Sequence, residues 1–360
     1  MRAPRPVGRT VARISRPRER TRRRWAALPV NPHVHARLCA RIQAPHCVEW
    51  RPPPGTAAPP RRLRVLFWNV ARLGAIEAVA ARIRELEVDV ALLAEVDLGM
   101  ARTGNRHTVA ELAGRLGMGY AFGVEFVELG LGSAEERRRH AGARNLAGLH
   151  GNAILTALPM HSPRMLRLEN RGLWFDGQWG ERRIGGRMAL LAELPLPGGV
   201  LTCVCTHFES HTDPADRDAQ MATLLAALDE RDAPRPVLIG GDLNSSTFDL
   251  PSRRDPARVR AALMQDPSRL LDPTPYEPLF ARAARAGFSW QECNPPAAPT
   301  LRPSRSRPHD ICGRIDWFLT RGLSCRNAIL LPAVGPDGRE LSDHDAIAVD
   351  VQLAKSADAR

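Results

Sequence analysis

From Leu63 onward, the apolar residues of this chain follow two spacings. Nearly continuous apolar runs are typical of strands buried on both faces, and apolar positions three and four residues apart are typical of amphipathic helices. Strands are predicted at 63–68, 88–94, 119–128, 150–157, 187–193, 199–206, 236–240, 314–319 and 346–353. Helices are predicted near 75–87, 109–116, 214–228 and 277–287. This alternation indicates one α/β domain, in which the Pro- and Arg-rich region 250–312 forms long loops.

The first 62 residues lack this periodicity and are rich in arginine and proline. They contain 15 arginines against two acidic residues, a net charge of +13, whereas residues 63–360 are nearly neutral at −1. This composition predicts a disordered arm at 1–62, a folded domain at 63–354 and a disordered tail at 355–360. The arm fits contact with nucleic acid or anionic lipid, and a merely solvated extension is an equally good interpretation.

The composition as a whole is typical of a globular protein. A hydrophobic content of 44% allows a sizeable core, and no apolar run approaches the ~18 residues that a membrane span needs. Seven cysteines without a CxxC pair favour a reducing compartment, so we expect a cytoplasmic location, with a monomer as the default. Zinc is not expected, because no known zinc spacing fits His33, His35, Cys39, His46 and Cys47.

Polar residues stand at the ends of many predicted strands, within one of them at Asp316, and just before the last one at Asp343 and His344. They are Asn69, Glu95, His207, Asp242, Asn244, Asp316, Asp343 and His344. Residues two positions apart on a strand point to the same face, so Asp242 and Asn244 share one. The strands of α/β sheets usually place their chemistry at their carboxyl ends. The pattern therefore predicts one site that is distributed over several strands.

The residue types of this set indicate a divalent metal and a phosphate ester. Carboxylate and amide oxygens are hard ligands, which suit Mg²⁺ or Mn²⁺ better than zinc. A metal offsets charge on the phosphate, imidazoles and amides donate hydrogen bonds to its oxygens, and a carboxylate accepts a proton from water. Each residue alone has an ordinary explanation, such as a surface acid for Glu95, a turn former for Asn69 and a structural histidine for His207. Their combination favours a site.

In combination and order, these motifs resemble the endonuclease/exonuclease/phosphatase superfamily, the group of pancreatic deoxyribonuclease, apurinic-site endonucleases, neutral sphingomyelinases and inositol polyphosphate 5-phosphatases. The resemblance runs from about Leu63 to Leu353, and the segment 151–155 looks like the central strand of the family. The matching motifs are the opening Asn69, the metal-binding Glu95, Thr-His at His207, Gly-Asp-x-Asn at Asp242 and Asn244, Ile-Asp-Trp at Asp316, and Ser-Asp-His at Asp343 and His344. Ala94 departs from the family, which usually has glutamine there.

This resemblance implies a fold and a role for each residue. The fold would be a four-layer α/β/β/α sandwich, in which two packed mixed sheets carry helices outside. The metal, Mg²⁺ or Mn²⁺, would be held by Glu95 and Asp343, with Asn69 close by. The catalytic residues would be Asp242, which orients or deprotonates the water, Asn244, which binds phosphate, and His207 and the Asp316–His344 pair, which contact phosphate oxygens or act as acid and base.

The resemblance leaves the substrate open, because the family acts on DNA, RNA, lipids and inositol phosphates. Nucleic acid is slightly favoured, on the strength of the arginine arm and of Arg302, Arg305 and Arg307. The alternative is a lipid or small-molecule phosphodiesterase or phosphatase. Its apolar rim would be formed by Trp174, Phe175 and Trp179 near Arg182 and Arg183, although loop packing explains these aromatics better. A catalytically inactive binding protein is disfavoured, because no expected catalytic residue type is missing.

Overall fold

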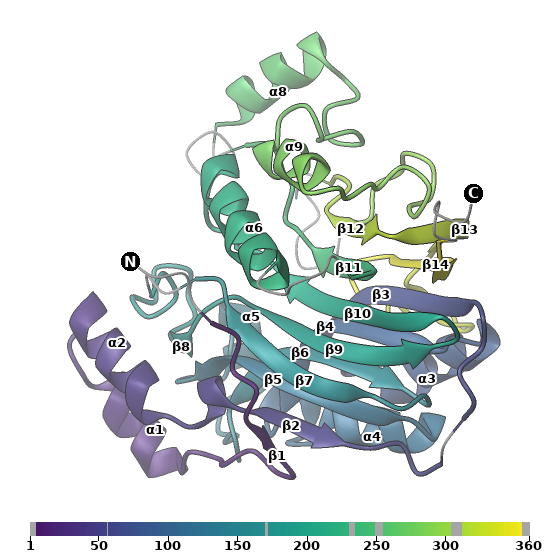
Figure 1. Cartoon of the computed structure of the whole chain (residues 1–360). Helices are drawn as coiled ribbons and strands as arrows, with labels where there is room; N and C mark the ends of the chain where they lie inside the picture. Colours follow the sequence, from purple (N-terminus) through teal and green to yellow (C-terminus); the bar gives the residue numbers. More distant parts are fainter. Residues whose placement is uncertain are drawn as a thin grey trace, which may run out of the picture.

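The computed structural model describes residues 5–55, 57–169, 172–229, 235–248, 255–303 and 312–354, which form two stacked β-sheets with helices outside them (Figure 1). The strands of the large sheet are β1 (Thr10–Val11), β2 (Val48–Arg51), β3 (Leu63–Arg72), β4 (Val90–Leu98), β5 (Gly119–Glu128), β6 (Leu149–Thr156), β8 (Arg183–Gly185), β13 (Leu323–Leu331) and β14 (Ala346–Leu353). Their order is β1-β2-β5-β6-β4-β3-β14-β13, with β8 beside β5.

The small sheet lies against the large one. Its strands are β7 (His161–Arg167), β9 (Met188–Leu196), β10 (Gly199–His207), β11 (Val237–Asp242) and β12 (Asp316–Arg321), in the order β12-β11-β10-β9-β7. The helices are α1 (Glu19–Ala26), α2 (Pro32–Arg41), α3 (Ile76–Glu85), α4 (Thr108–Leu116), α5 (Ala134–Arg139), α6 (Pro214–Asp229), α8 (Pro256–Gln265) and α9 (Pro278–Arg285). Among the described residues, no helix is long and apolar enough to cross a bilayer.

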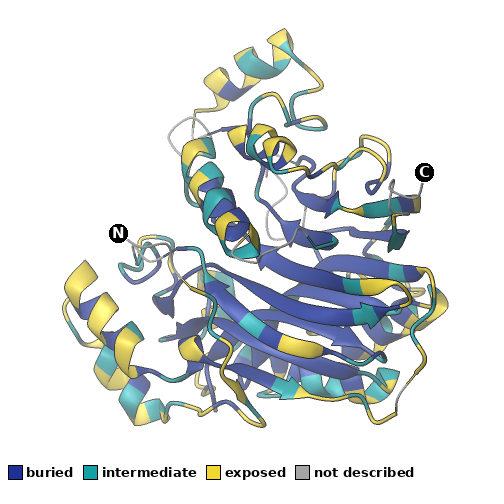
Figure 2. Ribbon diagram, in the orientation of Figure 1, coloured by how far each residue is buried: buried dark blue, intermediate teal, exposed yellow. Residues whose placement is uncertain are grey.

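Three apolar cores hold these layers together. Along β3 the side chains alternate, so that Phe67 faces the small sheet in the middle core, whereas Leu66 packs toward α3 and α4 in the outer core. A third core joins the small sheet to α6 and α9. Figure 2 shows the strands of both sheets mostly buried and the exposed positions mainly on the helices and the connecting loops. The four-layer sandwich is therefore confirmed.

The strand pairing brings the candidate site residues to one edge of the two sheets. Strand β3 runs parallel to β4, and β10 runs parallel to β11, so the carboxyl ends of each pair lie together. Strand β12 runs antiparallel to β11, which places Asp316 at its start opposite Asp242 at the end of β11. His207 occupies the matching position on β10. Three of the candidate site residues thus stand in one row across neighbouring strands.

All nine predicted strands and all four predicted helices are present, and the bounds of β14 agree with the prediction. The sequence pattern missed α8, which lies in the region expected to form long loops. Helix α8 buries only Val259 and exposes 79% of Met264, so it has no apolar face for the pattern to reveal. Asp255, whose side chain caps the helix, and Pro256 in its first turn were the available signals.

The N-terminal region is folded, so the interpretation of residues 1–62 as a disordered arm is wrong for residues 5–55. Helix α2 buries Val34 and Leu38 in the outer core, and β2 extends the large sheet by pairing with β5. His35, one of the residues considered for zinc, instead places its Nε2 atom 3.1 Å from both backbone polar atoms of Gly185. Residues 1–4 and 355–360 lie outside the described residues.

Candidate active site

A buried carboxamide links the two sheets at the centre of the site. The Nδ2 atom of Asn69, at the end region of β3, donates to Asp242 Oδ2 at 3.0 Å and to Glu95 Oε1 at 3.3 Å. Asn69 is only 1% exposed, so both hydrogen bonds are made away from bulk water. Because Glu95 belongs to the large sheet and Asp242 to the small one, this amide fixes the distance between two carboxylates from different layers.

Glu95 points into the site because its strand is irregular there. Its φ is 58°, a left-handed conformation that is uncommon for a residue with a side chain, and the register between β4 and β6 shifts between Leu93 and Val96. Such a bulge re-aims a side chain and is over-represented beside active sites. Glu95 also forms an ion pair with Arg72. Burial alone would raise the pKa of Glu95, but the charge of Arg72 holds it well below its usual range.

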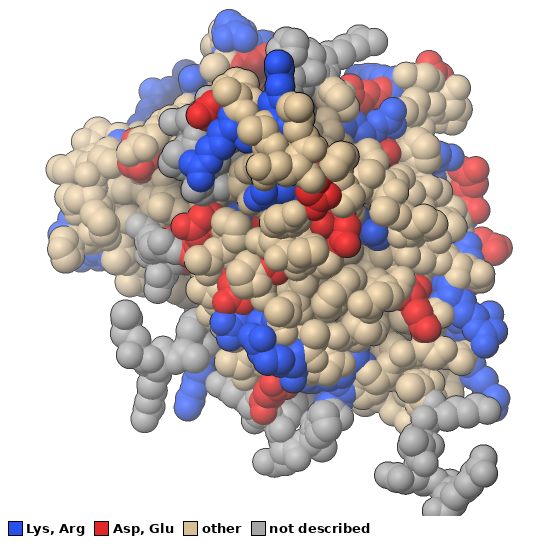
Figure 3. Space-filling view, turned by 90° about the horizontal axis from the view of Figure 1, so that it is seen from above, with Lys and Arg blue, Asp and Glu red and all other residues tan. Residues whose placement is uncertain are grey.

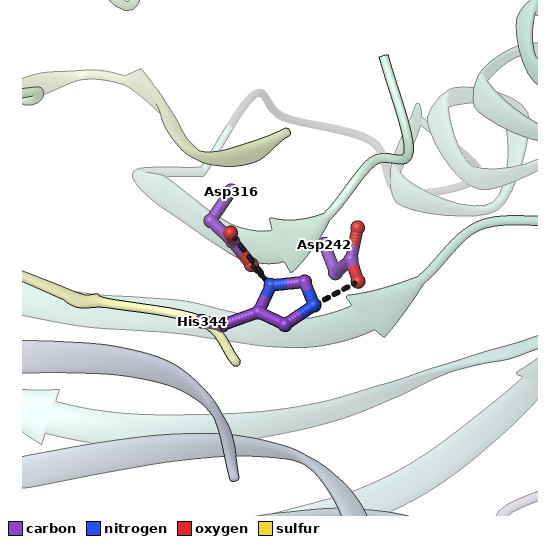
Figure 4. Close-up of side chains that lie close together, drawn as sticks. All are labelled: Asp242, Asp316 and His344. Atoms are coloured by element: carbon purple, nitrogen blue, oxygen red, sulfur yellow. Dashed lines mark hydrogen bonds and ion pairs between the residues drawn. The ribbon is translucent and has the colours of Figure 1, made fainter. Parts of the chain in front are cut away.

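His344 lies between two carboxylates (Figure 4). Its Nδ1 atom is 2.9 Å from Asp316 Oδ2, and its Nε2 atom is 3.8 Å from Asp242 Oδ2. Burial would lower the pKa of His344, but the charges of Asp316 and Asp242 raise it well above its usual value. This shift favours the protonated ring, in which each of the two N–H groups faces one carboxylate.

His207 has the opposite protonation state. Its Nδ1 atom is 2.9 Å from Nη1 of Arg187, and a guanidinium can only donate, so Nδ1 accepts and Nε2 carries the proton. Nε2 faces Asp242 Oδ2 at 3.5 Å. Burial and then the charge of Arg187 hold the pKa of His207 well below its usual value. His207 is thus a neutral donor beside Asp242, whereas His344 is a charged one.

The two remaining predicted residues flank this cluster. Asn244 has a φ of 48°, its backbone N–H donates to Asp242 Oδ1 at 3.0 Å, and its Nδ2 atom donates to the backbone oxygen of Phe208. Asp343 is half-buried directly before His344, and its charge contributes to the raised pKa of that histidine. The structure therefore gathers Asn69, Glu95, Asp242, His207, Asp316 and His344 through direct contacts and places Asn244 and Asp343 beside them.

Two groups of ligand atoms in this cluster are candidates for a metal. The side chains of Asp242, Asp316 and His344 offer three atoms within 4.8 Å of one another. Both nitrogens of His344, however, already face carboxylates in this group. Glu95 offers further carboxylate oxygens on the large-sheet side, where it is paired with Arg72. Carboxylate oxygens are hard ligands, so the chemistry of this edge fits a hard divalent cation.

Comparison with known proteins decides the family. The model of the Endonuclease/Exonuclease/phosphatase family matches residues 66–344, which is most of the chain and includes the whole strand-end cluster. The chain belongs to the endonuclease/exonuclease/phosphatase family. Enzymes of this family are generally divalent-metal-dependent phosphoester hydrolases, which is the class of activity that the membership supports. No curated protein matches the chain.

Solved structures share the fold. They include an endonuclease/exonuclease/phosphatase from Beutenbergia cavernae DSM 12333 at 23% identity, covering 83% of this chain and 74% of that one with a TM-score of 0.56. The catalytic domain of human Nocturnin with a bound sulfate anion has 17% identity. This match covers 84% of this chain and 100% of that one, with a TM-score of 0.54. An endonuclease/exonuclease/phosphatase family protein from Bacteroides thetaiotaomicron has 11% identity. This match covers 84% of this chain and 99% of that one, with a TM-score of 0.54.

Arg187 is a site residue of this family member that the sequence analysis missed. Its buried guanidinium contacts His207, Glu125 and Glu209, and it thereby fixes which nitrogen of His207 carries the proton. The available signal was a lone arginine after two glycines, at the start of the apolar run that forms β9. A buried arginine needs carboxylate partners, and neither Glu125 nor Glu209 was singled out.

A second layer of charged groups supports Glu95 from behind. Arg72 contacts Glu136 at 3.4 Å as well as Glu95, and Arg102 forms two 2.8 Å hydrogen bonds with Asp97. The surrounding guanidinium groups more than offset burial and lower the pKa of Glu136 to about 2. These ion pairs hold the backbone and side chain of Glu95 in a rigid frame. Trp174 and Phe175 are buried, which confirms the loop-packing interpretation for these two aromatics, whereas Trp179 is half-buried against the ring of His211.

The carboxyl of Glu125 predicts an unusual dependence of stability on pH. Burial and the charge of Glu95 raise the pKa of Glu125 to about 7, so the folded state keeps a proton that the unfolded state releases above about pH 4.5. The free energy of unfolding should therefore fall by about 3 kcal/mol from this group as the pH rises from 4.5 to 7. Glu125→Gln, which mimics the protonated form, should remove this loss in urea unfolding measured at pH 5 and pH 8.

Glu209→Gln is the matched control on the same arginine. Burial would raise the pKa of Glu209, but Arg187 and bonds from His211 and Trp174 lower it well below its usual value, so its contribution to stability is present above about pH 4.5. This variant should therefore lose stability at pH 8. If both variants keep the pH dependence of the parent, Glu125 is ionised in the folded protein and the assignment is wrong.

Proposed function

We propose that this protein hydrolyses phosphodiester bonds of DNA or RNA with Mg²⁺ or Mn²⁺. The observation that carries the proposal is the convergence of carboxylates, carboxamides and two oppositely protonated imidazoles on Asp242, at the joined edge of both sheets. A phosphodiester needs a cationic partner, hydrogen-bond donors for its oxygens and a carboxylate near the attacking water. The cluster offers all three within one buried edge.

The residues take distinct roles in this proposal. Asn69, Glu95 and Asp343 would hold the metal, which when bound supplies positive charge against the phosphate oxygens. Asp242, whose pKa burial and the charge of Asp316 raise, is suited to accept a proton from water. His344 donates as a cation, His207 donates as a neutral ring, and Asn244, which contacts Asp242, would bind phosphate.

Nucleic acid is favoured over lipid by the charge distribution. The net positive charge is concentrated in the N-terminal region, whereas the rest of the chain is close to neutral. Figure 3 agrees with this distribution, because basic and acidic side chains are interspersed on the face seen from above. The rim arginines give less support, because Arg302 is paired with Asp345 at 3.1 Å, and Arg305 and Arg307 lie outside the described residues. The expected cytoplasmic location stays a prediction.

A substrate panel with and without EDTA tests this function. The panel comprises plasmid DNA, single-stranded DNA and RNA, apurinic duplex, sphingomyelin, phosphoinositides and bis-p-nitrophenyl phosphate, each with Mg²⁺ or Mn²⁺. We expect cleavage of at least one nucleic acid and its loss in EDTA. Glu95→Gln should raise the metal concentration needed for half-maximal rate, with partial recovery in excess metal.

The outcomes separate the hypotheses. Cleavage confined to sphingomyelin or phosphoinositides would replace the nuclease assignment with the lipid or small-molecule alternative. Activity that survives exhaustive chelation would exclude the metal mechanism. No turnover of any substrate, together with metal binding measured by calorimetry, would favour an inactive binding protein.

A further inference from the structure

Helix α1 presents a row of exposed arginines. Arg20, Arg23 and Arg24 are three and four residues apart, so they share one face of the helix, and all three are exposed. We call these three residues with Arg144 the α1 surface. Arg144 is 69% exposed in its side chain and lies 3.8 Å from Glu19, which also pairs with Arg23. The two segments are therefore adjacent although they are far apart in the sequence.

This surface is fixed to the body of the protein rather than carried on a mobile arm. Arg22, on the opposite side of α1, is 4% exposed, and its guanidinium donates to the backbone oxygens of Asn145 and Ala147. Asn145 in turn accepts from the backbone N–H of Ala101 at 2.8 Å. The arginines of α1 thus stand at a set position relative to the large sheet.

The positive charge of this surface is poorly compensated. Glu19 is the one acidic residue between residues 5 and 48. Among the described residues, no carboxylate lies within ion-pair distance of Arg20 or Arg24, which are four residues apart on the helix. Like charges at this spacing destabilise a helix. An anionic partner would offset this repulsion, so the arrangement favours the binding of an anion.

The surface continues toward the candidate active site. Arg144 lies five residues after the end of α5, on which Arg138 and Arg139 are exposed. The inner side of α5 carries Glu136, whose carboxylate contacts Arg72, the ion-pair partner of Glu95. The chain thus runs from Arg144 back to α5, and ion pairs connect Glu136 of α5 through Arg72 to the carboxylate proposed to hold the metal.

We propose that the α1 surface binds backbone phosphates of a nucleic acid, outside the bond that is cleaved. This inference rests on the proposed function, since it assigns a polymeric substrate to the same site. Arginine suits the role because its planar guanidinium binds phosphate oxygens through two parallel hydrogen bonds. An anionic membrane would meet the same arginines and the exposed Leu146 next to them, so vesicles form the second arm of the test.

Binding to a 30-base-pair duplex in EDTA tests the surface without hydrolysis. Each phosphate neutralised contributes about 0.9 to the slope of log affinity against log salt, so R20Q/R23Q/R24Q should flatten this slope by about 2.7. The ratio of parent to variant affinity should then fall about fortyfold between 50 and 200 mM salt. Glu19→Gln should tighten binding to the duplex. R20K/R23K/R24K keeps the charge and should keep most of the affinity of the parent.

A matched variant controls for net charge. R84Q/R326Q/R339Q removes the same charge from three exposed arginines on other elements, namely α3, β13 and the segment between β13 and β14. It should leave the salt slope of the parent nearly unchanged. Equal effects of the two triple variants would overturn the proposal, because the duplex would then sense only the total charge.

Two further readouts separate this proposal from the proposed function. Turnover of bis-p-nitrophenyl phosphate should be the same in the parent and in R20Q/R23Q/R24Q, because this substrate is too short to reach α1. If neither protein turns over bis-p-nitrophenyl phosphate, the proposed function is contradicted. The comparison of duplex binding would still test the α1 surface. Binding to phosphatidylserine vesicles that is lost in the variant, with duplex binding unaffected, would assign the surface to membranes instead.

Discussion

Asp316→Asn is expected to lower turnover about 10²- to 10⁴-fold while leaving the fold and the metal affinity nearly unchanged. Asp316 faces His344 Nδ1 at 2.9 Å, and its charge is the main influence that keeps the ring protonated despite burial. Asparagine keeps the shape of the side chain but removes that charge. His344 then loses both its fixed orientation and its positive charge toward the phosphate. The measurements are steady-state rates, circular dichroism and calorimetric titration with Mg²⁺ or Mn²⁺.

The pair should behave as one unit. His344→Ala should be about as damaging as Asp316→Asn, and the double variant should be little worse than either. Asp350→Asn is the control, because Asp350 is also a strand carboxylate, paired with Arg64 at 2.8 Å on the antiparallel β14–β3 pair. It should retain the turnover of the parent. Additive losses in the double variant would show that Asp316 and His344 work separately.

The layers of this fold were predictable because buried strands leave a direct trace in the sequence. Runs such as 90–94 are apolar throughout, since the strand packs on the small sheet with one face and on helices with the other. The polar residues that end these runs were predictable for the same reason, since a polar side chain after a buried strand stands out. Asn69 and Asp242 are examples, and both lie in the site.

The direction of Glu95 and the protonation of the histidines were not predictable in this way. Glu95 reaches the site through a bulge with a φ of 58°, which depends on the register between neighbouring strands. His207 is neutral because Arg187, twenty residues away in the sequence, donates to its Nδ1 atom. His344 is charged because Asp316 and Asp242 flank it. These properties arise from contacts between strands, which a one-dimensional pattern does not contain.

The N-terminal region was misjudged because composition outweighed local signals. Asn31 caps α2 through a 2.9 Å hydrogen bond to the backbone N–H of Val34, and Pro32 occupies the first helical turn. Val34 and Leu38 have the spacing of one helical face. These signals span only ten residues, and the fifteen arginines around them are typical of disorder. Folding there depends on the body of the protein, which supplies the surface that α2 covers.

The N-terminal region should therefore be required for stability. Glu49 on β2 is 2% exposed and accepts hydrogen bonds from the backbone N–H of Ile14 at 2.7 Å and from Tyr120 Oη at 2.8 Å. His107 uses Nδ1 to accept at the start of α4, which leaves Nε2 to donate to Glu49 at 2.7 Å. Glu49→Ala would leave three donors without this acceptor, two of them buried, and should lower the free energy of unfolding by about 2 to 4 kcal/mol.

Deletion of residues 1–62 should have a larger effect than this substitution. It removes β2 from the edge of β5 and uncovers the apolar residues on which α2 packs, so the shortened protein should be insoluble or melt far below the parent. Urea unfolding and thermal melting measure both changes, and Glu19→Gln, at a partly exposed residue of the same region, should leave both nearly unchanged. A soluble shortened protein with the melting temperature of the parent would show that α2 and β2 contribute little to the fold. The burial of Glu49 among three donors argues for the opposite result, because such a carboxylate is stable only where the N-terminal region and the body fold together.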